Sequence, residues 1–147
     1  MTLYPSKSKP YLKPKMINKV TALKIMFYLL GSLLVFHLLV LIQIIPYDIV
    51  WAGKIKNTQE LYAFESVSIL INASMLFVLY LKFKNIKNNA SNKLVNGIIW
   101  GFVGLFALNT IGNLFAEAVL EQVLGTFLTL VSAVLCWIIA SKKTPSF

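Results

Sequence analysis

The sequence predicts an all-α integral membrane protein, a four-helix bundle with both termini in the cytoplasm. Three observations predict this fold. The 147 residues are 58% hydrophobic and 13% charged, with a mean hydropathy of +0.75, whereas about a quarter of a soluble domain is charged. Four apolar stretches are long enough to cross a bilayer, which takes about 20 helical residues. The lysines gather at alternate ends of these stretches, as in cytoplasmic loops.

The chain divides into a basic arm, one membrane domain and a short tail. Inside lipid only hydrogen-bonded structures such as helices satisfy the backbone, so each apolar stretch is predicted to be a helix. The first stretch is too long for a signal peptide and ends at Pro46 without a small-residue cleavage site, which favours a signal anchor. The predicted spans are residues 25–45, 61–83, 94–115 and 119–140. They lie between an arm of residues 1–24 and a tail of residues 141–147.

The distribution of lysines sets the predicted orientation. Residues 1–24 carry six lysines, the connection between the second and third spans carries four, and the tail carries two. The other side has only Lys54 and Lys56. Because lysine-rich loops stay in the cytoplasm, both termini are predicted to lie inside a cell membrane. The Lys-, Asn- and Ile-rich composition is typical of a bacterial protein, so the expected location is the inner membrane.

The basic residues also indicate a partner. The net charge is +9, and all fourteen basic residues are lysines. The absence of arginine argues against nucleic acid as a partner, because arginine is preferred for reading bases and phosphates. The Pro- and Lys-rich arm is instead expected to meet anionic lipid headgroups. Four short helices enclose little volume, so a homodimer or a larger membrane complex is a further expected partner.

Polar side chains inside the spans form the predicted binding site. A polar group in a bilayer is costly, so it marks a functional site by default. At 100° per residue, the polar residues of the second span fall on one side of the helix, and those of the third span follow a slow spiral. We predict that they face each other in a vestibule open to the outside, assisted by His37. The predicted site residues are Glu65, Ser68 and Asn72 in the second span and Asn109, Asn113 and Glu117 in the third.

The acidic residues all lie on the outer side of the predicted membrane topology. Besides Glu65 and Glu117, the acids are Asp48, Glu60 and Glu121, and all five fall in the outer half or the outer loops. The three additional acids are predicted to form the outer rim of the vestibule. The antiparallel arrangement of the first two spans makes a contact between His37 and Glu65 geometrically plausible.

Glycines in the third span predict close helix packing. Gly97 and Gly101 form a GxxxG step, and Gly104 continues the same face, where helices can approach closely. The packing partner is either another helix of this chain or a second copy.

The sequence carries no recognised catalytic motif. HExxH, GxSxG, P-loop and GxGxxG patterns are all missing. One histidine and one cysteine, Cys136, cannot form a usual structural zinc site, and no metal or cofactor is predicted.

Three functions are therefore considered. The first is binding or transport of a small cation, a proton-coupled solute or an amphiphile in the vestibule. The second is a structural or accessory subunit of a larger membrane complex, in which the polar groups hold helices together. The third is a lipid-modifying enzyme that uses Glu65 with Glu117 or His37, which leaves enzymatic activity an open question.

Overall fold

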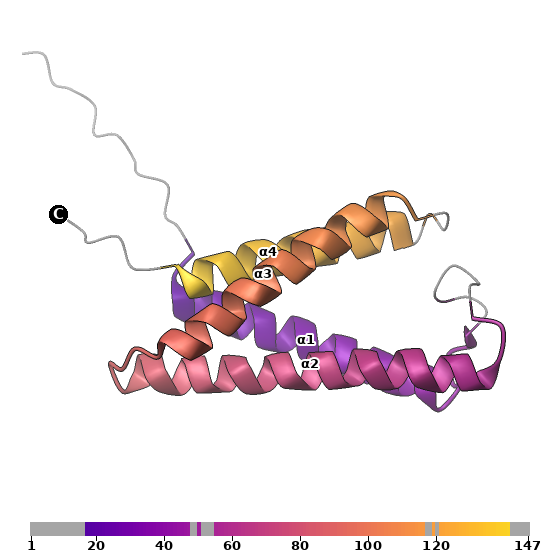
Figure 1. The fold of residues 1–147 in the computed structure, drawn as a ribbon, viewed down its shortest axis with the longest axis horizontal. Coiled ribbons are helices and arrows are strands. Elements are labelled where there is room, and N and C mark those ends of the chain that lie inside the picture. The colour runs from indigo at the N-terminus through magenta and orange to yellow at the C-terminus, as the bar shows by residue number, and fades with distance from the viewer. Residues whose placement is uncertain (1–16, 48–49, 51–54, 117–118, 120, 142–147) are drawn as a thin grey trace, which may run out of the picture.

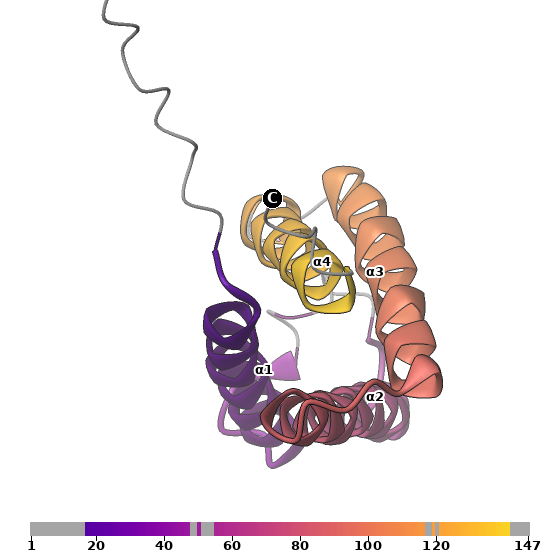
Figure 2. The same cartoon turned by 90° about the vertical axis from the view of Figure 1, so that its left-hand side faces the viewer.

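The computed structural model describes residues 17–47, 50, 55–116, 119 and 121–141, and it is built from four long helices. All four are long and apolar enough to cross a membrane, the last when the helical turn before it is included, from Gln122 to Ala140. Figure 2 shows them in a ring in chain order, so that each helix adjoins the next and α4 returns to α1. The helices are α1 (Lys19–Leu41), α2 (Thr58–Lys87), α3 (Lys93–Leu114) and α4 (Thr126–Ala140).

Asparagine caps explain where three of the helices begin. Asn18 accepts hydrogen bonds from the backbone N–H groups of Val20 and Thr21, and Asn57 and Asn92 cap α2 and α3 in the same way. Such caps satisfy N–H groups that have no partner within the helix. Because of the cap at Asn18, α1 begins six residues before the predicted span, inside the segment assigned to the basic arm.

Left-handed residues explain where α1 and α2 end. Gln43 and Asn89 have φ values of 59° and 51°. The N–H of the following residue reaches back to the carbonyl of Leu39 in α1 and of Asn85 in α2, at 3.0 and 2.8 Å. This is the Schellman motif, which closes a helix with one left-handed residue. The first helix therefore stops at Leu41, before the predicted end at residue 45.

The fourth span is confirmed as a helix, but its start differs from the prediction. Residues Glu121–Gly125 form a π-helical turn, η3, and the regular α-helix follows at Thr126. Within η3, a Cβ built on Gly125 would stand 2.9 Å from the side-chain amide of Asn113. The glycine therefore allows the beginning of the last helix to approach α3 closely.

The four helices share a core at one end only. This core joins α1, α2, α3 and α4 through residues near the N-terminal ends of α1 and α3 and the C-terminal ends of α2 and α4. We call this the closed end. Its buried side chains include Leu23, Met26, Leu79, Ile99, Cys136 and Ile139.

Beyond the closed end the helices separate into two hairpins (Figure 1). α1 and α2 stay together and are joined at the far end by a small cluster of Val40, Ile55 and Leu61. α3 and α4 run as a second pair that diverges from the first. We call this the open end. The divergence separates the outer parts of α2 and α3, where the sequence places most of the predicted site.

The glycine face of α3 is not used for packing within the described chain. Gly97, Gly101 and Gly104 are exposed, and a Cβ added to any of them would meet no atom within 4 Å. α3 instead contacts its neighbours through Val95, Ile99 and Thr110. The contact of these glycines with a second copy stays a prediction.

Candidate binding site

A cleft of about 460 Å³ lies between the two hairpins and is lined by α1, α2 and α3. Its volume is in the range of small-molecule sites. Ten of its sixteen lining residues are apolar, among them Leu30, Phe64 and Phe106. The polar lining residues are His37, Ser68, Asn72, Asn109 and Asn113.

The cleft brings together five of the seven residues placed in the predicted vestibule. Asn72 is buried and Ser68 and Asn113 are half-buried, whereas Asn109 is exposed on the cleft wall. Their placement follows from helical spacing, because residues three or four positions apart lie on the same side of a helix. The two helices present these residues towards each other where the hairpins diverge.

Glu65 lies behind the cleft wall rather than on it. Its side chain is 0% exposed, and Oε2 lies 2.7 Å from Nδ1 of His37, which is 12% exposed and lines the cleft. A buried carboxylate needs such a partner, because desolvation of an unpaired charge is costly. The pair therefore joins α1 to α2 and places an imidazole, not a carboxylate, at the surface of the cleft.

Of the remaining acids of the prediction, Glu60 has a described side chain, and it does not line the cleft. Glu60 sits in the first turn of α2, where Oε2 accepts the N–H of Lys56 at 2.8 Å, and therefore supports the start of that helix. Asp48 and Glu117 lie outside the described residues, as does the side chain of Glu121. Among the described residues, no three His, Cys, Asp or Glu side chains come together in a way that could hold a metal ion.

A hydroxyl cluster fixes the α3–α4 hairpin beside the cleft. Thr110 Oγ1 lies 3.0 Å from Thr129 Oγ1, and Asn113 Nδ2 donates to the same Thr129 oxygen at 3.4 Å. Each threonine also bonds a carbonyl four residues earlier, at Phe106 and Gly125. Asn113 therefore lines the cleft and also contacts α4 within the hairpin.

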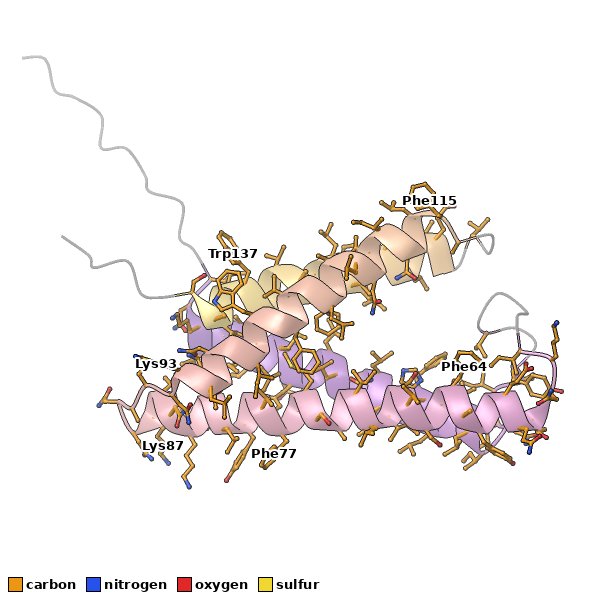
Figure 3. The ribbon with its side chains drawn as sticks, in the orientation of Figure 1. Phe64, Phe77, Lys87, Lys93, Phe115 and Trp137 are labelled. Atoms are coloured by element: carbon orange, nitrogen blue, oxygen red, sulfur yellow. The ribbon has the colours of Figure 1, made fainter. Side chains whose placement is uncertain are left out.

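The apolar walls were missed by the sequence analysis. Phe64, Leu105 and Phe106 line the cleft. In an apolar span, residue type alone does not distinguish such residues from those expected to face lipid. In Figure 3, Phe64 lies on the side of α2 towards the second hairpin, whereas Phe77 projects from the other side. Only the separation of the hairpins distinguishes these two phenylalanines.

Fold and cleft together describe a four-helix protein with a polar-lined cleft, whose helices fit a multi-pass membrane protein by length and composition. Comparisons with protein-family models, curated proteins and solved structures find no match. The functional argument therefore rests on the geometry of the cleft.

Proposed function

We propose that the chain is a multi-pass membrane protein whose cleft binds an amphiphile, a molecule with an apolar body and a compact polar group. The observation that carries this proposal is the composition of the cleft, in which ten apolar residues surround two amide-bearing helix faces and one imidazole. Ligand sites are commonly mainly apolar, with a few polar groups that orient the ligand.

The same composition favours an amphiphile over a bare cation. A cation site in a membrane protein uses carboxylates or converging carbonyl oxygens. Glu65, the acid of α2 nearest to the cleft, is buried behind His37 and does not line it. Asn72, Asn109 and Asn113 can both donate and accept hydrogen bonds, which suits hydroxyl, ester or amide groups.

Lysines support the orientation in a plasma membrane. Lys24, Lys84, Lys87 and Lys93 lie at or near helix termini of the closed end, and Figure 3 labels Lys87 and Lys93 at the turn between α2 and α3. By the positive-inside rule the closed end belongs in the cytoplasm. The cleft then lies in the outer half of the bilayer, where it can take an amphiphile for holding or transport.

A photo-crosslinking experiment tests the binding proposal. The full chain is placed in lipid nanodiscs with a diazirine-bearing monoacylglycerol, and the modified residues are located by mass spectrometry. We expect labelling of Phe64 to saturate and to be displaced by excess unlabelled monoacylglycerol. Labelling of Phe77, which does not line the cleft, should increase linearly and resist displacement. The two phenylalanines are a matched pair, because both are on α2 and are 50% and 62% exposed.

Variants of the cleft sharpen this test. Replacing both Asn72 and Asn109 by leucine removes two polar groups of the cleft and should lower the apparent affinity by about tenfold. Asn85→Leu makes the same chemical change on α2 outside the cleft and should leave the affinity unchanged. Equal displacement at Phe64 and Phe77, or no displacement at either, would overturn the proposal.

The His37–Glu65 pair favours an enzyme as a second candidate. A carboxylate bonded to one imidazole nitrogen orients the ring and supports its action as a general base. Because His37 lines the cleft, a bound ester could be hydrolysed there. Release of fatty acid from monoacylglycerol by the wild type, with at least a roughly hundredfold loss in His37→Gln, would support this candidate. No turnover by a preparation that passes the binding test would exclude it for this substrate.

A further inference from the structure

The two ring nitrogens of His37 have different surroundings. Nδ1 lies 2.7 Å from Oε2 of Glu65, whereas Nε2 is accessible and has no hydrogen-bond partner among the described residues. The side chain lines the cleft and is 12% exposed. Because Nδ1 is occupied by Glu65, Nε2 is the ring atom that can form a hydrogen bond with a ligand in the cleft.

The carboxylate of Glu65 determines which ring nitrogen carries the hydrogen. An ionised carboxylate only accepts hydrogen bonds, so the contact at 2.7 Å requires a hydrogen on Nδ1. In the neutral ring, Nε2 then has a free lone pair and acts as an acceptor. Glu65 also has another interaction, but the position of the hydrogen depends only on the contact at Oε2.

Asn72 supplies a second polar group without a partner, deeper in the cleft. It is 6% exposed and lines the cleft, and its side-chain amide bonds no group of the described residues. It follows Glu65 by seven residues on α2, about 10 Å along the helix towards the closed end. An amide both donates and accepts, so Asn72 can bond either kind of ligand group. Selection between donors and acceptors therefore depends on His37.

A contact that only joins two helices does not explain this arrangement. Such a contact needs one ring nitrogen and does not require the other to be accessible at the wall of a cleft. If the helices cross a bilayer, a polar atom at this depth is costly without a hydrogen-bond partner. A ligand that donates a hydrogen bond would supply the partner that the described part of the chain does not give to Nε2.

We propose that the cleft selects amphiphiles whose polar group includes a hydroxyl, which donates its hydrogen bond to Nε2 of His37. An ether, or an ester without a hydroxyl, offers only acceptors, and two acceptors cannot form a hydrogen bond. Glu65 is a positioning residue, because it acts through the ring and does not line the cleft. This inference rests on the proposed function and narrows the ligand to a long-chain alcohol or an acyl compound with a free hydroxyl.

Two competitors that differ in one hydrogen-bond donor test this selectivity. The full chain in nanodiscs is labelled with the diazirine-bearing monoacylglycerol at pH 8, and hexadecanol or its methyl ether is added at equal mole fractions of the bilayer. Both competitors have an oxygen that accepts, but only the alcohol donates. Hexadecanol should displace the label at Phe64 about ten times more effectively than the ether.

Glu65→Gln tests the positioning role. The new amide can donate to Nδ1 as well as accept from it, so the hydrogen is no longer confined to Nδ1. The preference for hexadecanol should then fall to about twofold or less. A purely structural role would weaken both competitors and leave their ratio unchanged. Glu60→Gln makes the same change five residues earlier on α2, outside the cleft, and should keep the full preference.

The ring hydrogen can be located directly, because the chain has one histidine. Labelling with nitrogen-15 histidine, in the full chain without a histidine tag, gives ring signals from His37 alone in an NMR spectrum. At pH 8 we expect the hydrogen on Nδ1 in the wild type and in Glu60→Gln, and at least partly on Nε2 in Glu65→Gln. This measurement needs no ligand, so it tests the role of Glu65 separately from binding.

His37→Gln provides an independent variant if Glu65→Gln does not fold. Glutamine both donates and accepts, so it replaces the fixed acceptor with a group that bonds the alcohol and the ether alike. The preference for hexadecanol should fall in this variant as well. A preference that stays about tenfold in His37→Gln would show that another group selects the hydroxyl.

The outcomes separate this inference from the proposed function. If hexadecanol and its ether displace the label at Phe64 equally well in the wild type, the cleft still binds amphiphiles and only this inference is overturned. A hydrogen on Nε2 in the wild type at pH 8 would overturn it too. If neither competitor displaces the label at Phe64, the binding proposal fails and this inference fails with it.

Discussion

Nδ1 of His37 lies 2.7 Å from Oε2 of Glu65, and this contact joins α1 to α2 between their two apolar clusters. On one side are Leu30 and Met75 of the closed-end core, and on the other are Val40 and Leu61. The glutamate is fully buried, while the histidine lines the cleft. A change at His37 in the cleft therefore also affects the buried contact between α1 and α2.

The first prediction concerns the energy of this contact. A double-mutant cycle of His37→Leu and Glu65→Leu should give a coupling of about 1–3 kcal/mol in the free energy of unfolding, because each single change removes one polar contact from a largely buried polar group. Unfolding in mixed micelles by a denaturing detergent measures it. His37→Leu combined with the distant Phe77→Leu should be additive. A coupling of His37 with Glu65 below about 0.5 kcal/mol would contradict the prediction.

The second prediction compares two glycines. Gly125→Ala should destabilise the chain by about 1 kcal/mol, because the new Cβ would stand 2.9 Å from the Asn113 side chain. Gly101→Ala meets no atom within 4 Å and should stabilise the chain by up to about 1 kcal/mol through helix propensity. Both are measured by detergent unfolding of the monomer. If both variants changed the stability in the same direction, the surroundings described for one of the two glycines would be wrong.

The third prediction separates two neighbours on α3. Thr110→Val removes the hydroxyl that contacts Thr129 and should cost about 1 kcal/mol of stability. Asn109→Leu changes an exposed residue of the cleft and should leave stability within about 0.5 kcal/mol while weakening monoacylglycerol binding. Unfolding and photo-crosslinking on the same preparations check both parts. A loss of stability in Asn109→Leu as large as that in Thr110→Val would contradict the distinction.

The fourth prediction uses the left-handed end of α1. Gln43 has a φ of 59°, a conformation that costs an L-residue about 1 kcal/mol and costs glycine nothing. Its Nε2 also donates to the Tyr62 hydroxyl at 3.3 Å, in an exposed place where the bond contributes little. Gln43→Gly should therefore raise the Tm, and Gln43→Ala should not. A lower Tm in the glycine variant would mean that the contact with Tyr62 outweighs the backbone strain.

Much of the fold could be predicted from the sequence because the signals are local. Apolar length and the period of 3.6 residues predict the four helices. The predicted first and last residues of the helices were less accurate. The cap at Asn18 was not identified, and Gln43 is not a residue expected to adopt a left-handed conformation. Sequence spacing reveals neither the π-helical turn before α4 nor the close approach of Gly125 to Asn113.

The candidate site was predictable in its polar residues and not in its walls. Asn72 and Asn109 stand out in apolar helices, and helical spacing puts Asn72 on one face with Ser68 and Asn109 on one face with Asn113. Phe64 and Phe77 look alike in the sequence, and only the divergence of the hairpins makes one of them part of the cleft. Lys82 was interpreted only as a topology signal, because burial against α3 is a property of packing between distant segments.

The closed-end core also has a mechanical consequence. From Ile99 in the core to Leu114 at its far tip, α3 runs for about 22 Å, so a rotation of about 10° about the core would displace the tip by about 4 Å. A rotation about the core moves each hairpin most at its far end. A small change in packing around Cys136 would therefore be amplified at the open end. Substitutions of core residues that do not line the cleft, such as Cys136 and Ile139, should therefore alter the aperture of the cleft from a distance.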